Sequence, residues 1–570
     1  MSERQKIRWL LASAAVVAVS LFVLITRRET AKDTTAPTVP ADLTVSAASF
    51  SQINLTWTAS TDNTGVTGYR IYRNGQQVAT TVLTTYLDGG LTTATEYLYA
   101  VSAYDAAGNV SAESAMASAS TQSTTISPRY PLKMSSNRRY FVDQNNVPVL
   151  VIGDAPQSLG GQLNRTQQTT YFSDRQAHGF NAAWINLLCA EYTACRADGK
   201  TSSGVAPFTS GSCPSDYDLS TPNEDYFALY DATINLAASH GIIVFLDPIE
   251  TGSWLTTLRN NGFTKAFSYG VYVANRYKNF PNVIWMSGND FANYIVSFDN
   301  ALVGQVMAGI ASVDSNHLQT IELDPTDKGN TDSYSNQDTD LSAYYGADIA
   351  YSYAPTYNVV LNAYNSTPTT PVILGEGNYE FENNIGYSGG VTDTYLLRET
   401  AYWTLTSGGI GGYLYGSKYT WRSTWASDPG KLLDTTGAAQ IAHINTLFNG
   451  IQWWTLVPDQ NHAVVTAGYG TYTKGDSEPR HNTYCSTAAS ADRRLAVVYC
   501  PAHTTLTVAM STFSGAVIAR WYDPSNGTFT AISGSPFPNS GSGDFTMPGN
   551  NADGDPDWVL LLEATGPTAS

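Results

Sequence analysis

Basic residues are scarce in this chain of 570 residues. It carries 30 Lys and Arg against 48 Asp and Glu, which gives a formal net charge of −18, and only 14% of its residues are charged. Proteins that bind nucleic acids gather Lys and Arg on one surface to contact phosphates. The composition therefore predicts that no nucleic acid is a partner.

Histidine and the motifs of several enzyme classes are also scarce or missing. The seven histidines form no pair at metal-ligand spacing. There is no H-E-x-x-H, no phosphate loop, and no G-x-S-x-G elbow with a histidine nearby. These absences exclude zinc peptidases, P-loop enzymes and serine hydrolases of the elbow type. No metal and no cofactor is expected.

Only five cysteines are present, and none has zinc-site spacing. Cys485 and Cys500 flank a predicted hairpin, and Cys195 and Cys213 could close a loop, so both pairs are disulfide candidates. Cys189 ends an apolar run and is expected to be a buried thiol. Disulfides favour an extracytoplasmic location.

One long apolar run occurs, from residue 9 to residue 25, with basic residues before and after it. A basic segment followed by an apolar one is typical of an export signal. Its length of roughly 17 residues is at the lower limit for a membrane-spanning helix. Residues 1–29 are therefore expected to be a signal peptide or, preferably, a signal anchor. The rest of the chain would be secreted or anchored to the cytoplasmic membrane.

Residues 30–40 form a Thr/Pro-rich linker, and residues 41–124 show short alternating strands without helical periodicity. The stretches "DNTGVTGYRIYRNGQQV" and "YAVSAYDAAGNVSAES" resemble a fibronectin type III domain. That resemblance implies a seven-stranded β-sandwich, a module that usually serves as a spacer.

Strands alternate with helices between residues 127 and 450. Eight strand candidates, each followed by a helical pattern, favour a (β/α)8 TIM barrel over an open sheet. The candidates are 147–154, 182–189, 242–248, 282–290, 318–324, 349–355, 371–376 and 411–417. Residues 451–566 lack helical patterns and are expected to form a small β-sandwich.

Acidic and aromatic residues stand where these strands end, and the active site of such a barrel lies at that face. Paired carboxyl groups among aromatic rings are what glycosidic bond cleavage requires. Two sets of residues have alternative explanations. Asp154 and Asp247 bind sugar hydroxyls or brace the barrel floor; Tyr353, Tyr379, Tyr415 and Trp421 are substrate platforms or rim packing.

Strands 4 and 7 lie across the barrel from each other, and each ends on a carboxylate. Asp290 is assigned as the general acid/base and Glu376 as the nucleophile, although Asp290 could instead cap the following helix. The Asn289 side chain is expected to bind the hydroxyl next to the anomeric carbon. Glu191, Glu322 and Asp324 are expected to be loop residues or to lie behind the reacting groups.

Five stretches together resemble the apiosidase-like glycoside hydrolases, family 140 and its relatives. They are "RRYFVDQNNVPVLVIGDAPQSL", "YFSDRQAHGFNAAWINLL", "RYKNFPNVIWMSGND", "VILGEGNYE" and "RETAYWTLTSGGIGGYLYGSKYTW". The resemblance covers roughly residues 130–450 and implies an Asp on strand 4 and a Glu on strand 7, which match Asp290 and Glu376. It also implies a C-terminal β-sandwich of the type labelled collagen-binding. The characterised activity of the family is release of apiose from a pectic side chain.

The chain departs from that family at the ends of strands 1, 2 and 4, near the expected sugar. The reaction class should persist there, while the sugar and its linkage stay open. We expect a monomeric glycoside hydrolase that acts on a plant or bacterial polysaccharide or oligosaccharide, with retention. The alternatives are an endo-acting glycanase with an open cleft, shaped by residues 190–222, and a non-catalytic surface protein that binds carbohydrate.

Overall fold

A computed structural model describes residues 33–47, 53–88, 91, 95–121, 130–189, 191–292, 296–323, 346–353, 356–383, 390–472 and 482–565. The chain divides into two compact units, Met1–Thr124 and Thr125–Ser570. The expected signal peptide or anchor at residues 1–29 lies outside the described residues. Within the described ranges, no helix combines the length and the apolarity needed to span a bilayer.

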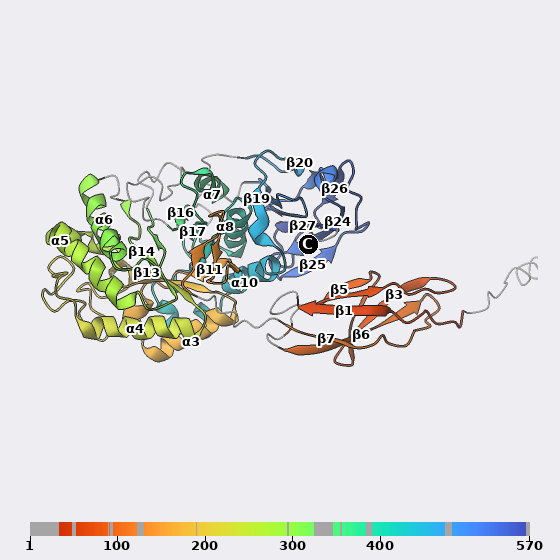
Figure 1. Ribbon diagram of the computed structural model, residues 1–570, viewed down its shortest axis with the longest axis horizontal. Helices are drawn as coiled ribbons and strands as arrows, with labels where there is room; N and C mark the ends of the chain where they lie inside the picture. The colour runs from red at the N-terminus through yellow and green to blue at the C-terminus, as the bar shows by residue number, and fades with distance from the viewer. Residues whose placement is uncertain are drawn as a thin grey trace, which may run out of the picture. The chain divides into compact units, whose positions relative to one another are not determined.

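The first unit is the expected fibronectin-like β-sandwich. One sheet has the order β1-β2-β5 and the other the order β4-β3-β6-β7, all antiparallel (Figure 1). The strands are β1 (Ala41–Ala47), β2 (Ile53–Thr58), β3 (Val66–Arg73), β4 (Gln76–Thr81), β5 (Thr85–Asp88), β6 (Glu96–Asp105) and β7 (Ala117–Ser120). Alternate residues of β2 are buried, as Ile53, Leu55 and Trp57 show. This period of two is what a half-buried strand requires.

Eight parallel strands form the centre of the second unit, which confirms the barrel prediction. Their order in the sheet is β15-β14-β13-β12-β11-β18-β17-β16, and the backbone N–H of Gly346 donates to Gln319 O (2.8 Å) across the two ends. The strands are β11 (Val151–Asp154), β12 (Ala182–Asn186), β13 (Ile243–Asp247), β14 (Val283–Met286), β15 (Gln319–Thr320), β16 (Asp348–Tyr351), β17 (Val372–Glu376) and β18 (Gly412–Tyr415).

Helices cover the outer face of this sheet, and Figure 1 shows α3 to α6 outside β13 and β14. The helices are α2 (Leu159–Gln162), α3 (Arg165–Ala177), α4 (Glu224–Ser239), α5 (Thr251–Tyr277, interrupted at Gly262), α6 (Ser297–Ala311), α7 (Thr356–Asn365), α8 (Thr394–Thr406), α9 (Pro429–Leu432) and α10 (Thr436–Phe448). Several begin at a residue whose side chain accepts a first-turn N–H, such as Asn164, Asn223 and Asp393. Such caps satisfy backbone donors that the helix itself leaves unpaired.

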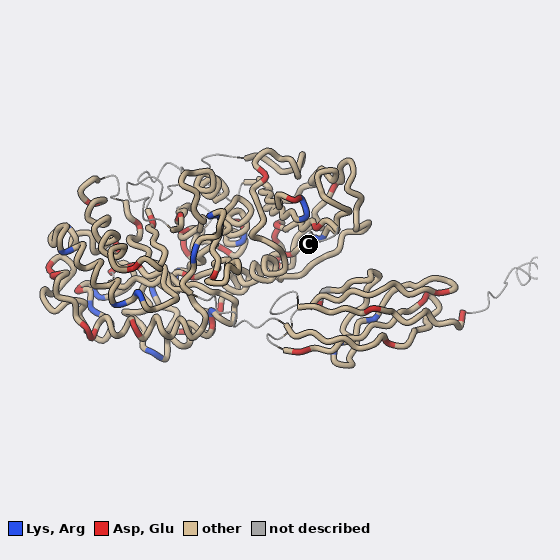
Figure 2. The backbone as a smooth tube through the Cα atoms, viewed as in Figure 1, with Lys and Arg blue, Asp and Glu red and all other residues tan. Residues whose placement is uncertain are grey.

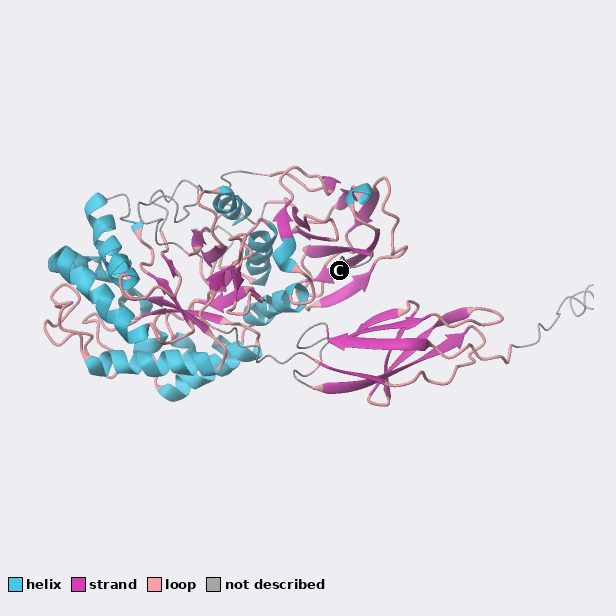
Figure 3. Cartoon of the chain, viewed as in Figure 1, coloured by secondary structure: helices cyan, strands magenta, loops and turns pink. Residues whose placement is uncertain are grey.

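The C-terminal part is built from two antiparallel sheets, β19-β21-β22-β27-β24-β25 and β20-β23-β26 (Figure 3). The strands are β19 (Leu456–Pro458), β20 (Val465–Ala467), β21 (Ser486–Ser490), β22 (Leu495–Cys500), β23 (Thr505–Val508), β24 (Ala516–Asp523), β25 (Thr528–Ala531), β26 (Gly543–Thr546) and β27 (Trp558–Thr565). A short antiparallel sheet of β8 (Lys133–Met134), β9 (Phe141–Val142) and β10 (Pro148–Val149) precedes the barrel.

A buried ion cluster joins the barrel to the C-terminal sheets. Arg398 of α8 is fully buried; its guanidinium donates to Asp557 (2.8 and 2.9 Å), Asp555 (2.7 Å) and Gln440 (2.6 Å). Tyr402 of α8 stacks on Tyr499 of β22, with ring centroids 5.2 Å apart. Barrel and C-terminal sheets therefore share one core.

Replacing Arg398 with Ala should lower the free energy of unfolding of the second unit by about 3–5 kcal/mol, because the buried Asp557 carboxylate and the partly buried Asp555 carboxylate lose their partner. Lys265→Ala is the matched control, since Lys265 is 41% exposed in its pair with Asp218, and exposed pairs contribute about 0–1 kcal/mol. Urea unfolding followed by tryptophan fluorescence measures both. Equal losses in the two variants would contradict the assigned role of the cluster.

Candidate active site

Three carboxyl groups meet at the carboxyl ends of the barrel strands. Asp290 follows β14, Glu322 follows β15, and Glu376 ends β17. One oxygen of each lies within 4.8 Å of the others. Asp290 is half-buried, Glu322 is fully buried, and Glu376 is 6% exposed. The strand-4 and strand-7 carboxylates predicted from the sequence therefore lie side by side.

A left-handed turn places Asp290. Beyond β14, Gly288 has φ +117° and Asp290 has φ +46°. Asp tolerates the left-handed region better than most residues, although it still costs about 1–2 kcal/mol. The backbone N–H of Asp290 donates to Glu322 Oε2 at 3.3 Å, which helps hold the turn.

A β-bulge places Glu376. Ala350 pairs with Leu374, but the next residue, Tyr351, pairs with Glu376, so Gly375 is an extra residue in β17. Bulges re-aim the side chains that follow them. A Cβ on Gly375 would lie 2.3 Å from Ile349 Cγ2, inside the barrel, so only glycine fits without a shift. The bulge therefore turns Glu376 toward the mouth.

Two tyrosines donate to the Glu376 carboxylate. Tyr353 Oη donates to Oε1 at 2.5 Å and Tyr379 Oη to Oε2 at 3.1 Å, while Tyr351 Oη donates to Tyr353 Oη at 2.8 Å. Burial and the charge of Asp290 raise the pKa of Glu376 well above its usual value, and both tyrosine bonds act to lower that pKa. Tyr353 and Tyr379, predicted to touch substrate, are thus in contact with the expected nucleophile.

The Asn289 side chain is held by the protein at both ends. Its Oδ1 accepts from Tyr192 Oη and from Asn186 Nδ2 (3.4 Å), and its Nδ2 donates to Glu322 Oε2 at 3.3 Å. Thr251 Oγ1 donates to its backbone oxygen at 2.5 Å. The amide is fully buried, and one Nδ2 hydrogen remains for a further acceptor.

Asp247 lies beneath the mouth rather than in it. Its Oδ1 accepts from the N–H groups of Gly288 (3.1 Å) and Ile249 (3.0 Å). Burial raises its pKa to about 7 and that of Glu250, the N-cap of α5, to about 8, with the charge of Asp247 adding to the latter. Of the two roles considered for Asp247, the structure favours bracing the turn that carries Asp290.

The contacts of Asp154 and Tyr415 favour the second of the two roles considered for each, bracing the barrel for Asp154 and packing for Tyr415. Asp154 accepts from Tyr171 Oη (2.8 Å) and pairs with Arg175 Nε (2.7 Å), both on α3. Tyr415 donates to Glu380 and packs in the outer core. Side chains alternate along a strand, so ending a barrel strand does not by itself place a residue inside the mouth.

Trp421 and Tyr192 form an aromatic wall of the site. Their ring centroids are 6.1 Å apart, and Trp421 Nε1 donates to Glu382 Oε1 at 2.9 Å. Trp421 was predicted from the sequence and Tyr192 was not. The available signal for Tyr192 was its position in a short segment between two cysteines.

The cysteine pairing differs from the expectation in one of two cases. Cys485 and Cys500 are bonded as predicted. Cys195 is bonded to Cys189, with Cα atoms 5.7 Å apart, and Cys213 is a free thiol, so the Cys195–Cys213 pairing was wrong. Strand β12 ends at Asn186, before Cys189, and the chain then turns back through a 3₁₀ segment at Glu191–Thr193. The resulting small loop carries Tyr192.

Proton chemistry suits this donor set better than metal chemistry. The three carboxyl groups could supply oxygens to a shared hard cation, which takes six or more such ligands. However, both Glu376 oxygens already accept tyrosine hydroxyls, and Glu322 Oε2 accepts two N–H groups. The arrangement therefore fits groups that exchange protons.

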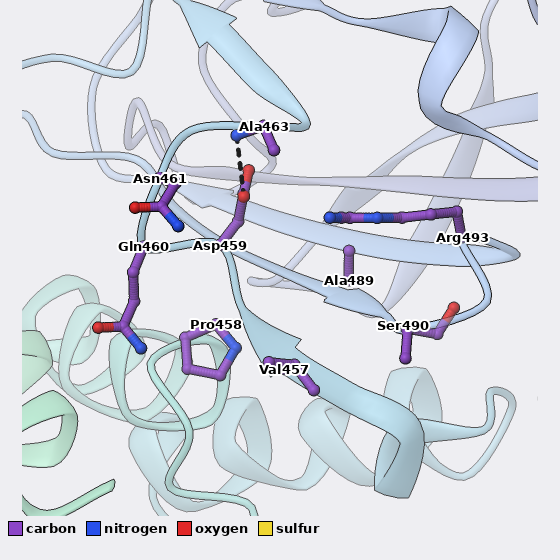
Figure 4. A pocket seen from close by; sticks show the side chains of 10 residues that line it. Val457, Pro458, Asp459, Gln460, Asn461, Ala463, Ala489, Ser490 and Arg493 are labelled. Atoms are coloured by element: carbon purple, nitrogen blue, oxygen red, sulfur yellow. Dashed lines mark hydrogen bonds between the residues drawn. The ribbon is translucent and has the colours of Figure 1, made fainter. Parts of the chain in front are cut away.

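A hollow lined by other residues lies on the C-terminal sheets (Figure 4). It measures about 430 Å³ and is lined by residues of 457–463 and 489–493. Asp459 there accepts the backbone N–H groups of Ala463 (2.9 Å) and Val464 (2.7 Å). The lining has no pair of carboxyl groups that could cut a glycosidic bond.

Comparison with known proteins gives the same order of domains. The fibronectin type III model matches residues 36–120, the model described as "Apiosidase-like, catalytic domain" matches 135–455, and a collagen-binding domain of a collagenase matches 475–563. A solved "Glycoside hydrolase" superposes with a TM-score of 0.64 at 20% identity, covering 77% of this chain and 98% of that one. A glycoside hydrolase family 5 structure from Bacteroides vulgatus gives 0.63 at 21% identity, covering 76% and 93%.

Curated relatives match over short segments. Exoglucanase B of Cellulomonas fimi is 47% identical over 111 residues, which are 19% of this chain and 10% of that protein. The chain spans 7% and 18% of the next two relatives. The fold is the barrel of these two solved glycoside hydrolases. Because the apiosidase-like model covers more than half of the chain, the protein belongs to the apiosidase-like family.

Tyr353→Phe should shift the acidic limb of the pH–activity profile upward by about one to two pH units. The lost bond stabilises the ionised form of Glu376, and hydrogen bonds to charged groups contribute about 1.5–3 kcal/mol. Tyr415→Phe, which removes a hydroxyl outside the mouth, is the control and should leave the limb in place. A downward shift in Tyr353→Phe would contradict the assignment.

Proposed function

We propose that this protein hydrolyses O-glycosidic bonds in a plant or bacterial polysaccharide or oligosaccharide, with retention at the anomeric carbon. The observation that carries the proposal is the placement of Asp290 and Glu376, whose carboxyl oxygens lie within 4.8 Å. Retaining enzymes hold their carboxyl groups about 5–5.5 Å apart, whereas inverting ones need about 6.5–9.5 Å to admit a water molecule.

The two carboxyl groups take different roles in this scheme. Asp290 protonates the leaving oxygen while Glu376 attacks the anomeric carbon, which forms a glycosyl–enzyme ester. Asp290, now ionised, takes a proton from water, and that water cleaves the ester and frees Glu376. The tyrosine donors on Glu376 support this division, because they stabilise a carboxylate that must be ionised to attack.

The neighbouring residues would bind the sugar. In this proposal, the second Nδ2 hydrogen of Asn289 donates to the hydroxyl next to the reacting carbon. Trp421 and Tyr192 offer ring faces, on which sugars pack through their apolar C–H faces. A non-catalytic carbohydrate-binding role is disfavoured, since binding alone needs no buried pair of carboxyl groups.

We further propose that the protein acts outside the cytoplasm. Two disulfide bonds support this, because such bonds persist in oxidising compartments. The expected export segment at residues 1–29 agrees with it. Basic residues are few in the sequence and scattered along the described tube in Figure 2.

Glu376→Gln and Asp290→Asn should each reduce hydrolysis by at least about 10³-fold with folding intact, because each removes a group that forms or breaks bonds. The purified protein is incubated with a panel of plant and bacterial polysaccharides, and products are measured by mass spectrometry. Circular dichroism checks the fold of each variant. Wild-type turnover that persists in both variants would refute the assignment.

A further inference from the structure

Glu322 is the third carboxyl group of the site, and the proposed mechanism gives it no chemical step. It is fully buried. Its Oε2 accepts the Asn289 amide and the Asp290 backbone N–H, both at 3.3 Å. Its Oε1 is buried without a hydrogen-bond partner. A buried carboxylate oxygen without a donor is costly when it carries charge.

In the part of the chain that the structure describes, the charged groups that act most on Glu322 are negative. The groups with most influence on it are Glu376 of β17 and Asp290 after β14, and Tyr379 also lies near enough to interact. Among the described residues, no Lys, Arg or His belongs to the groups that act most on Glu322 or Glu376. Three carboxyl groups so close together, two of them buried, do not all ionise.

The hydrogen bonds decide where the negative charge is best tolerated. Glu376 receives hydroxyl donors on both oxygens, whereas Glu322 receives N–H donors on one oxygen only. Burial, followed by the charges of Glu376 and Asp290, raises the pKa of Glu322 well above its ordinary value. Of Glu322 and Glu376, Glu322 is therefore the one that better accommodates a proton.

We propose that Glu322 is a positioning residue that works as a neutral acid. Its Oε2 fixes the left-handed Asn289–Asp290 turn. Because Glu322 is neutral, the negative charge of the three carboxyl groups stays on Glu376. The proposal rests on the proposed function of Asp290 and Glu376. A neutral carboxyl accepts the two N–H groups through its carbonyl oxygen, so positioning needs no charge.

The test compares Glu322→Gln, which copies the neutral acid, with Glu322→Ala, which removes the acceptor. Activity is measured on the polysaccharide of the panel that the wild type cleaves fastest. We expect Glu322→Gln to keep at least about one third of kcat, and Glu322→Ala to lose about 10²-fold in kcat with KM nearly unchanged, because a displaced catalytic group costs about that much. An inactive Gln variant or a fully active Ala variant would overturn the proposal.

A second measurement needs no substrate. A raised pKa means that the folded state keeps a proton that the unfolded chain releases, so the wild type loses stability as pH rises above the ordinary Glu value. Glu322→Gln lacks this loss. The quantity to follow is the ratio of the unfolding constant of the wild type to that of Glu322→Gln. From pH 5 upward, this ratio should rise by up to about tenfold per pH unit. Glu191→Gln, which removes an exposed carboxyl, is the control. A ratio that does not change with pH would overturn the proposal.

The two measurements separate the two claims. If the wild type cleaves nothing in the panel, or if Glu376→Gln and Asp290→Asn stay active, the proposed function fails while the pH dependence still tests Glu322. If those two variants are inactive as expected and Glu322→Gln is as inactive as Glu322→Ala, only the inference about Glu322 fails.

Discussion

The structure of the site depends on the crowding of three carboxyl groups, and none of the described groups that act most on Glu322 or Glu376 is basic. Asp290, Glu322 and Glu376 share a space where one oxygen of each lies within 4.8 Å of the others. Like charges at this distance in a water-poor site force protons onto some members. The distribution of hydrogen-bond donors then decides which member stays ionised. In the proposed mechanism, that asymmetry separates an acid from a nucleophile among residues of nearly the same intrinsic chemistry.

Local backbone irregularities create this crowding, and the rest of the barrel holds them in place. The extra residue Gly375 turns Glu376 inward, and the left-handed residue Asp290 turns its own carboxyl toward it. Asp247 braces the second turn from below through the Gly288 N–H. Tyr192, in the loop closed by Cys189 and Cys195, donates a hydrogen bond to the Asn289 side chain. Irregular backbone of this kind persists only where contacts with the surrounding structure hold it in place.

The sequence predicted the architecture well, because eight apolar strands alternating with helices admit few folds. It predicted the strand-4 and strand-7 carboxylates for the same reason, since the strand ends of a barrel meet at one face. It left the roles of Asp154 and Tyr415 open, because those roles depend on the direction of a side chain at a strand end: Asp154 pairs with Arg175 of α3, and Tyr415 packs in the outer core. The bulge at Gly375 leaves no periodic signal, and Glu322 shows its role only through its contacts. The disulfide partner of Cys195 depends on where β12 ends, and the apolar run in the sequence does not show that end.

The most direct test of the central claim is the configuration of the newly formed sugar. Proton NMR follows the anomeric signals during the first minutes of hydrolysis of a polysaccharide that the wild type cleaves, before mutarotation mixes the anomers. Two carboxyl groups this close predict that the first product has the same anomeric configuration as the bond that was cut. A first product of opposite configuration would show that water attacks directly, and would contradict Glu376 as a nucleophile.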